Sequence, residues 1–293
     1  MRSPSGSWTP SRSRARGSVF RQPKIEYKTV EQMLVMREAG LVLSRALDSA
    51  VAAAQVGVTT AQLNRVFEEI LREAGATSNF LGYHGFPASI CTSVNEEVVH
   101  GIPGGYALQD GDILSIDGGA VVRGWHSDSA RTTIVGTARP EDERLSQVTE
   151  DALWHGIAAL ASARYVGDVG AAIDDHVSSV PGPALGILED YVGHGIGTEM
   201  HQAPDVLNYR SSARGPRVRG GLCLAIEPML VQGGLETAVL DDEWTVVTTD
   251  GGRASQWEHS VAVHDGGIWV LSAVDGGASR LEPLGVTPVL PAA

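Results

Sequence analysis

Apolar residues recur at helical spacing near the start of the chain and then give way to short runs typical of strands. Thr29 and Gln32 fit a capping box, and the apolar period that follows predicts a helix to about residue 54. Thr59 and Gln62 open a second predicted helix. From residue 80 to about 135, the pattern changes to β-like runs broken by glycines.

The same order of elements returns in the second half of the chain. Pro140 suits the first position of a helix, and apolar residues follow it at helical spacing as far as Leu160. A further helix is predicted around residues 169–177, and a β-rich stretch runs from 191 to 271. The order is therefore helices and then strands, twice, which indicates an α+β fold built from two α/β halves.

A weak internal repeat supports this division. One constant offset aligns Gly57 with Gly167 and the segment 111–117 with 221–227. Identities are few, so chance alignment of common α/β patterning is the alternative. Both aligned segments, however, end in a carboxylate, Asp117 in one and Glu227 in the other. Two halves related by a pseudo-twofold axis would bring these carboxylates to a shared centre.

Asp117 and Asp128 are expected to lie on one face of a hairpin. Asp117 closes an apolar run, and Asp128 lies eleven residues further on, after the dipeptide Arg123-Gly124. A two-residue turn at that dipeptide pairs residues whose numbers have an odd sum, which places both carboxylates on the same face. Two such carboxylates repel each other unless a cation or a shared proton lies between them.

Three more polar residues stand at strand ends or among glycines: His194, Glu227 and Glu258. Taken singly, such residues are more often turn caps, surface carboxylates or loop histidines. Together with Asp117 and Asp128 they make four carboxylates and one imidazole, which suit Mn, Fe, Co or Zn. Four carboxylates exceed the needs of one ion, which favours two divalent ions about 3.5–4 Å apart.

Composition narrows the classes of function. The chain has 293 residues and a formal net charge of −13, which argues against a protein whose whole surface binds nucleic acid. It has no apolar run long enough to span a membrane, and its basic N-terminus lacks the apolar stretch of a secretory signal. Two cysteines, Cys91 and Cys223, cannot make a disulfide framework, so a reducing cytoplasm is the expected compartment.

The two ends of the chain differ in composition from the body. Residues 1–24 carry six basic residues and no acidic one, and we expect a disordered basic tail there. A solvated leader without a role is one interpretation, and weak contact with an anionic partner such as ribosomal RNA is the other. Residues 274–293 are punctuated by Gly and Pro and are expected to be a loose end, leaving 25–273 as the folded domain that carries the candidate metal ligands.

Six short motifs are more specific than composition or periodicity. They are Gly82-Tyr83-His84-Gly85-Phe86-Pro87, Asn95-Glu96-Glu97-Val98-Val99-His100-Gly101-Ile102-Pro103, Ser127-Asp128, Gly193-His194-Gly195-Ile196-Gly197, Ile226-Glu227-Pro228-Met229 and Gln256-Trp257-Glu258-His259. With these motifs, the chain resembles type I methionine aminopeptidases from about residue 27 to 271. The resemblance implies the pita-bread fold, in which two pseudo-twofold-related α/β halves surround a dimetal centre.

The resemblance also implies a role for each polar site residue. It makes Asp128 and Glu258 the bridging metal ligands, Asp117 a bidentate ligand to one ion, and His194 and Glu227 ligands to the other. Two further histidines match positions near the substrate. His100 matches the one that contacts the first residue of the peptide, and His201 the one that stabilises the tetrahedral centre. His84, His126 and His259 have weaker claims and are expected to be structural or to support the ligands.

A pocket for the methionine side chain is implied in the same way. Tyr83, Phe86, Cys91 and Trp244 match its walls, with Phe80 and Met200 at its rim. A thioether suits an apolar, aromatic-lined slot. Phe80 and Met200 differ from the commonest family residues, as does Gly119, where related forms have a threonine.

The implied reaction is hydrolysis of the first peptide bond of nascent proteins and peptides whose second residue is small. Two ions would activate the attacking water, Glu227 would carry its proton, and His201 would stabilise the oxyanion. The expected catalytic residues are thus His100, His201 and Glu227, in a monomer without membrane or specific DNA contacts. An X-Pro aminopeptidase or prolidase of the same fold is the nearest enzymatic alternative, and a non-catalytic binding relative is the other.

Overall fold

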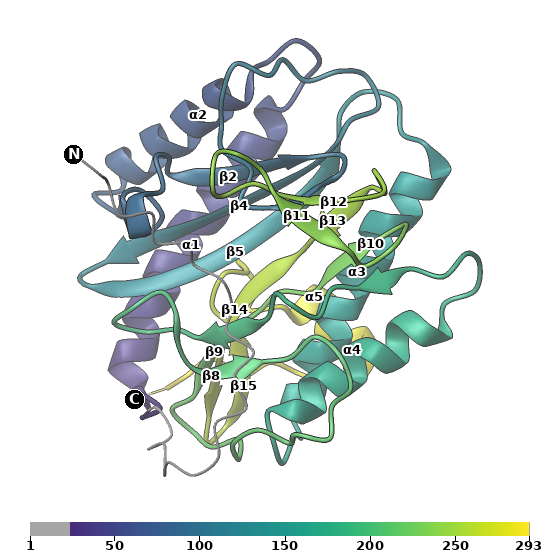
Figure 1. The fold of residues 1–293 in the computed structure, drawn as a ribbon. Helices are drawn as coiled ribbons and strands as arrows, with labels where there is room; N and C mark the ends of the chain where they lie inside the picture. The colour runs from purple at the N-terminus through teal and green to yellow at the C-terminus, as the bar shows by residue number, and fades with distance from the viewer. Residues whose placement is uncertain (1–23, 293) are drawn as a thin grey trace, which may run out of the picture.

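The structure is a computed structural model that describes residues 24–292. Within this range, four long helices occur in two pairs, followed by one short helix near the C-terminus (Figure 1). They are α1 (Val30–Ala53), α2 (Thr60–Glu73), α3 (Pro140–Leu160), α4 (Gly167–Ser179) and α5 (Ala278–Leu281). Single 3₁₀ turns lie at Tyr83–Gly85 and Glu282–Leu284.

The strands of the described residues form one large curved sheet and two small ones. The large sheet follows the order β1-β4-β5-β14-β9-β7-β8, with β2 added beside β4 and β15 beside β14. Its strands are β1 (Thr77–Ser78), β2 (Ile90–Val94), β4 (Ile113–Val122), β5 (Trp125–Ile134), β7 (Gly193–Gly195), β8 (Gln202–Val206), β9 (Cys223–Ile226), β14 (Glu258–His264) and β15 (Gly267–Val270). The small sheets have the orders β13-β10-β6 and β11-β12-β3. Their strands are β3 (Glu97–Val99), β6 (Gly186–Ile187), β10 (Met229–Val231), β11 (Thr237–Val239), β12 (Val246–Thr248) and β13 (Ala254–Gln256).

The helix starts follow the local signals of the sequence. α1 begins after Thr29, which forms the predicted capping box with Gln32, and α2 begins after Thr59, which forms the same box with Gln62. Each box satisfies backbone N–H groups that have no partner inside the helix. Pro140 occupies the first turn of α3, as predicted.

The two predicted α/β halves are present. The starts of α1 and α3, Val30 and Pro140, have the same separation in the chain as the starts of β4 and β9, Ile113 and Cys223. One buried cluster joins α1 and α2 to β2 and β4, and another joins α3 and α4 to β9, β14 and β15. Each helix pair therefore covers its own half of the same face of the sheet (Figure 1).

Alternation along the strands separates the core from the opposite face. In β4, Leu114 and Ile116 pack into the core beneath α1 and α2, so Asp117 projects from the other side. In β9, Leu224 and Ile226 pack into the core beneath α3 and α4. The face without helices is therefore the one on which polar residues gather.

The hairpin between β4 and β5 has the predicted register. Arg123 and Gly124 form its two-residue turn, and both have positive φ, 50° and 78°. Positive φ at both positions is the geometry of a type I′ turn, which matches the twist of the strands. Asp117 pairs with Ala130, and Asp128 pairs with Gly119, so the two carboxylates share one face.

The C-terminal segment differs from the expected loose end. Leu281 of α5 is fully buried in the core beside α3, and the backbone N–H of Val289 donates to the carbonyl of Ile268. This apolar side chain and this strand-edge hydrogen bond hold residues 274–292 against the body. Residues 1–23 of the predicted basic tail lie outside the described residues. No helix in the described range is long and apolar enough to cross a membrane.

Candidate metal and peptide site

The first row of site residues crosses three strands of the large sheet. Asp117 on β4, Ala130 on β5 and Glu258 on β14 stand opposite one another. Glu227 follows the last residue of β9, Ile226, which is paired with His259, so Glu227 continues this row beside Glu258. Because Ala130 has only a methyl side chain, the carboxyl groups of Asp117 and Glu258 can approach each other across it.

A second row lies next to the first on the same face. Asp128 on β5 faces Gly119 on β4, and Ser260 on β14 pairs with Ala225 on β9. The Ser260 hydroxyl donates to the carbonyl of Asp128 and accepts from its N–H, both at 2.8 Å. Ala225 pairs in turn with His194 on β7. Small residues therefore separate Asp128 from His194.

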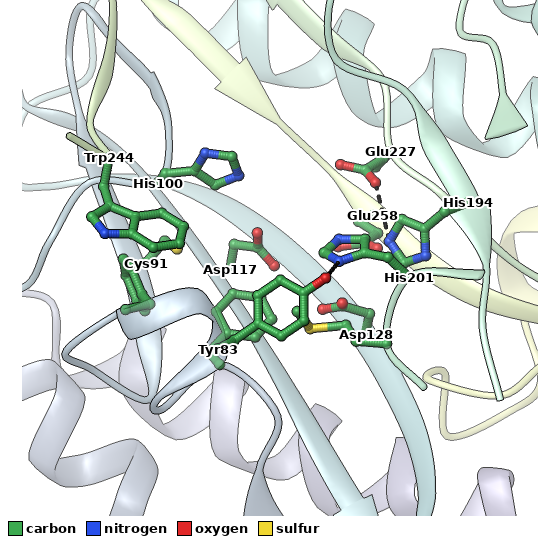
Figure 2. A pocket seen from close by; sticks show the side chains of 13 residues that line it. Tyr83, Cys91, His100, Asp117, Asp128, His194, His201, Glu227, Trp244 and Glu258 are labelled. Atoms are coloured by element: carbon green, nitrogen blue, oxygen red, sulfur yellow. Dashed lines mark hydrogen bonds and ion pairs between the residues drawn. The ribbon is translucent and has the colours of Figure 1, made fainter. Parts of the chain in front are cut away.

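Donor atoms of the two rows converge on one point. One ligand atom each from Asp128, His194 and Glu258 lies within 4.8 Å of the others. The amide of Gln256 donates to Asp117 at 3.5 Å and to Glu227 at 3.4 Å, which ties the two ends of the first row together. Figure 2 shows the four carboxylates and His194 pointing toward a common centre.

Four carboxylates at one place, three of them buried and Glu227 partly exposed, carry an electrostatic cost. Burial raises the pKa of Asp117 to about 7. Burial is also the largest cause that raises the pKa of Asp128 and Glu258 well above the usual range, and repulsion from neighbouring carboxylates adds to it. Burial does the same to the pKa of Glu227, with Asp117 adding to it. Asp117 Oδ1 and Glu258 Oε1 are buried without a hydrogen-bond partner among the described residues. The residues present therefore fit a divalent cation, which would neutralise the carboxylates and bind the unpartnered oxygens.

The protonation of His194 is determined by its surroundings. Its Nδ1 lies 3.0 Å from the carbonyl oxygen of Gly195, which can only accept a hydrogen bond. Nδ1 must therefore carry the proton, and Nε2 keeps its lone pair. Nε2 lies 3.5 Å from Glu227 Oε1, and burial lowers the pKa of His194 to about 3. A neutral imidazole whose lone pair faces a carboxylate is the arrangement of a metal ligand.

His201 and His100 stand on opposite sides of the pocket. His201 Nδ1 lies 2.7 Å from the hydroxyl of Tyr83, and its ring centroid lies 4.2 Å from that of His194. His100 packs edge-on against Trp244 at 6.3 Å and lines the same pocket. Burial lowers the pKa of both histidines to about 4, so both are neutral near pH 7.

An apolar wall completes the pocket, which has a volume of about 160 Å³. Phe86 contacts Trp244 edge-on at 5.1 Å and Phe80 at 6.3 Å. Tyr83, Cys91 and Met200 also line it. All the site residues expected from the sequence therefore line one pocket, including both rim positions: Phe80, Tyr83, Phe86, Cys91, His100, Asp117, Asp128, His194, Met200, His201, Glu227, Trp244 and Glu258.

Sequence reasoning missed two residues that hold the site together. Gln256 bonds to Asp117 and Glu227, and its only signal is its place in the motif before Glu258. Ser260 holds the backbone of Asp128 and has no signal of its own. His259 is buried beside Trp154 and lies 2.7 Å from the hydroxyl of Ser272, so it is structural, as expected.

Comparison with known proteins identifies the family to which the chain belongs. Residues 35–265 match metallopeptidase family M24. The chain is 45% identical to methionine aminopeptidase 1 of Mycobacterium tuberculosis, covering 85% of this chain and 95% of the relative. It is 38% identical to methionine aminopeptidase 1 of Bacillus subtilis, covering 84% and 98%. The chain belongs to metallopeptidase family M24.

Comparison with solved structures separates relatives that are similar in sequence from those that share only the fold. The methionine aminopeptidase of Thermotoga maritima matches with a TM-score of 0.82 at 36% identity, covering 85% of this chain and 99% of that one. The prolidase of Pyrococcus furiosus matches with a TM-score of 0.67 at 18% identity and covers 65% of that chain, so it shares the fold alone. The fold is the pita-bread fold, and the similarity in sequence is to methionine aminopeptidases, which are metal-dependent hydrolases.

Proposed function

We propose that this chain removes the N-terminal methionine from peptides and nascent proteins whose second residue is small. The observation that carries the proposal is the placement of four carboxylates and a neutral imidazole beside a pocket of one-residue size. The similarity to methionine aminopeptidases over most of the chain supports the same activity.

The proposed ligands of two divalent ions are Asp117, Asp128, His194, Glu227 and Glu258. Their two rows on one face, with small residues between them, support this number of ions. Co, Mn, Fe(II) and Zn all suit carboxylate and imidazole donors. Ions of this kind, when bound, polarise a carbonyl group and lower the pKa of a water nucleophile.

Proton transfer is assigned to Glu227. Its Oε2 accepts from Gln256, and its side chain lines the pocket at the boundary between the metal ligands and the peptide. Glu227 would take the proton of the attacking water and return it to the amine that leaves. The bond broken is the first peptide bond, and the products are free methionine and the shortened chain.

His201 is assigned to the oxyanion that forms at the scissile carbonyl. The Tyr83 hydroxyl, 2.7 Å from His201 Nδ1, can donate to that nitrogen and leave the proton on Nε2. A neutral Nε2–H then donates to the oxyanion as negative charge develops. His100, on the opposite wall beside Trp244, would contact the peptide at its first residue.

Methionine would enter the slot walled by Tyr83, Phe86, Cys91 and Trp244, with Phe80 and Met200 at its rim. Its flexible thioether can contact the edges of the aromatic rings. The substrates would be N-termini of nascent chains in a reducing cytoplasm, which agrees with two buried free cysteines, Cys91 and Cys223. Weak contact of the basic residues 1–24 with ribosomal RNA would add proximity to those substrates.

The test compares Met-Ala-Ser with Leu-Ala-Ser and Ala-Pro peptides, using chelated protein with and without added Mn or Co. Cleavage of Met-Ala-Ser alone, restored by metal, is expected. Preference for the Ala-Pro peptide would indicate that the chain is an X-Pro hydrolase. Tight metal binding without hydrolysis of any peptide would indicate a non-catalytic relative, and full activity without metal would contradict the metal site.

A further inference from the structure

Three arginines surround one tyrosine on the surface of the second half. The guanidinium carbons of Arg164, Arg214 and Arg217 lie 5.6, 5.5 and 5.7 Å from the ring centroid of Tyr165. Each contact is a cation–π interaction. Three positive charges are thereby held around a single ring, although like charges repel.

The backbone that presents these arginines is fixed by hydrogen bonds. The turn between α3 and α4 and the loop after β8 meet at a bridge between Tyr165 and Arg217. The N–H of Gly167 donates to the carbonyl of Arg214, and the N–H of Val218 donates to the carbonyl of Arg164, at 2.9 and 3.2 Å. The arginines therefore belong to a rigid frame and not to a free loop.

Charge is concentrated on this frame. Residues 207–222 contain four arginines and no acidic residue, in a chain with a formal charge of −13. One of the four, Arg210, is paired with Asp175, and the other three are Arg214, Arg217 and Arg219. Arg164, Arg214, Arg217 and Arg219 are exposed and form no ion pair with any carboxylate of the described residues. Asp168 on the turn accepts from the backbone N–H groups of Arg164 and Tyr165, and Asp265 lies against Gly220 without forming an ion pair with Arg219.

We propose that Arg164, Tyr165, Arg214, Arg217 and Arg219 form an arginine surface that binds the phosphate backbone of RNA. All four cations are arginines, whose planar guanidinium groups pair with phosphate through two parallel hydrogen bonds. The surface is open and lies outside the pocket of the peptide site, so it fits an extended polyanion better than a small anion. An RNA backbone would relieve the repulsion among the arginines by placing a negative charge between them.

An anionic membrane is the competing partner, and the composition of the surface disfavours it. Surfaces that enter a membrane combine cations with exposed apolar side chains. None of the large apolar side chains exposed in the described residues lies between residues 107 and 234, and Tyr27, which lies against Gly221 beside this surface, is an aromatic residue with a polar hydroxyl. RNA is therefore the favoured partner.

The test measures binding of the full-length protein to a fluorescent single-stranded RNA by anisotropy at several KCl concentrations. The variant carries Arg214→Gln, Arg217→Gln and Arg219→Gln. Its matched control carries Arg45→Gln, Arg65→Gln and Arg72→Gln on α1 and α2, which removes the same charge elsewhere. The basic residues 1–24 are present in both variants, so any binding they contribute is common to both.

The surface variant is expected to bind about tenfold to hundredfold more weakly near 0.1 M salt, with a salt dependence reduced by about two in slope. The control should stay close to the unmodified protein, and both variants should hydrolyse Met-Ala-Ser normally. Absence of RNA binding by the unmodified protein, or equal loss in both triple variants, would overturn the proposal. So would loss of binding to phosphatidylglycerol vesicles with RNA binding unchanged. Because the readout is RNA binding, the result does not depend on which peptide the enzyme cuts.

Discussion

The side-chain amide of Asn79 occupies the space into which a side chain at Gly119 would project. A Cβ placed on Gly119 would overlap the Oδ1 of Asn79. Gly119 faces Asp128 across the hairpin and shares a face with Asp117, so the Asn79 amide lies beside two proposed metal ligands. Asn79 is 8% exposed, and neither atom of its amide has a hydrogen-bond partner among the described residues. Asn79 therefore brings a polar group to the place where related forms carry a threonine.

This arrangement predicts that substitutions at the two positions are coupled. Gly119→Thr alone should overpack the site and lower the free energy of unfolding by about 1–3 kcal/mol. Asn79→Ala alone should weaken metal binding by removing the buried amide. The double variant should recover much of both losses, because the threonine then has space and returns a hydroxyl. Calorimetric titration with Mn and urea unfolding of all four proteins give the coupling energy.

Gly118→Ala provides the matched control for this cycle. A Cβ on Gly118 would meet Ile90 and Phe67 at 2.9 Å on the opposite face of β4. The loss in free energy of unfolding caused by Gly118→Ala should therefore add to the loss caused by Asn79→Ala, without coupling. A coupling energy for Gly119→Thr no larger than that for Gly118→Ala would contradict the assigned contact.

The contrast between Asp128 and Asn79 shows what the sequence could predict. Asp128 can be placed beside Asp117 from the sequence because a two-residue turn determines the register of the whole hairpin. Asn79 reaches Gly119 from a segment that precedes β2 in the chain, and no local pattern specifies that approach. The contact depends on how the segment after β1 folds over the sheet.

The internal repeat has a similar limit. The offset that aligns Asp117 with Glu227 would align Asp128 with Ala238, well short of Glu258. Strands β10 to β13 lie between β9 and β14, whereas β4 and β5 are joined directly. This insertion hides the second pair of equivalent carboxylates, which only their own sequence motifs reveal.

The boundary at residue 24 is tested by truncation. Just beyond it, Lys28 Nζ donates to Gln202 Oε1 at 3.2 Å, and Glu26 accepts from Thr198 at 2.6 Å. These contacts brace the loop that carries His201. Deleting residues 2–24 should leave tripeptide hydrolysis unchanged, whereas deleting residues 2–28 should raise KM and lower the melting temperature. A large loss of kcat after the shorter deletion would show that the catalytic body begins before residue 25.

A point variant separates chain length from the contact itself. Lys28 is buried, and the full-length Lys28→Met variant retains its apolar stem while removing the bond to Gln202. Its stability should fall by about 1–3 kcal/mol, since the Gln202 amide oxygen loses its buried partner. Lys24→Met, a change of the same type earlier in the chain, should be neutral because Lys24 is exposed.

The metal-free protein should lose stability as pH rises through neutrality. Burial raises the pKa of Asp117 from 3.8 to about 7, so the folded chain holds a proton that the unfolded chain has released. This stabilisation is complete below about pH 4 and is lost as pH rises through about 7. His100, His194 and His201 have lowered pKa values, so their effect has the opposite sign, but it is complete above about pH 6.5.

Between pH 6.5 and 8 the carboxyl groups therefore determine the trend. Asp117 alone should lower the free energy of unfolding by about 1 kcal/mol across this interval. Urea unfolding in EDTA should show the decline, and excess Mn should reverse it, because metal binds the ionised carboxylates. In EDTA, the Asp117→Asn variant should lack the part of this decline that is caused by Asp117. A metal-free protein that became more stable from pH 6.5 to 8 would contradict the four-carboxylate cluster.

The last prediction separates the roles of two histidines whose ring centroids lie only 4.2 Å apart. His194 is assigned to the metal because its Nδ1 proton is committed to the carbonyl of Gly195 and its Nε2 lone pair faces the carboxylates. His201 is assigned to the peptide because its Nδ1 is held by Tyr83 and its Nε2 is left to donate. His194→Ala should lose metal affinity together with activity.

His201→Ala should keep its metal and lose about 10²–10³ in kcat on Met-Ala-Ser, because its hydrogen bond strengthens mainly in the transition state. KM should change much less. Tyr83→Phe provides the intermediate case, since it retains the ring and removes only the hydroxyl that orients His201. Its loss in kcat should be smaller than that of His201→Ala and should vanish when His201 is already alanine. Native mass spectrometry for metal content and steady-state kinetics measure both properties. Metal loss in His201→Ala, or a normal kcat, would show that the roles of the two histidines have been assigned wrongly.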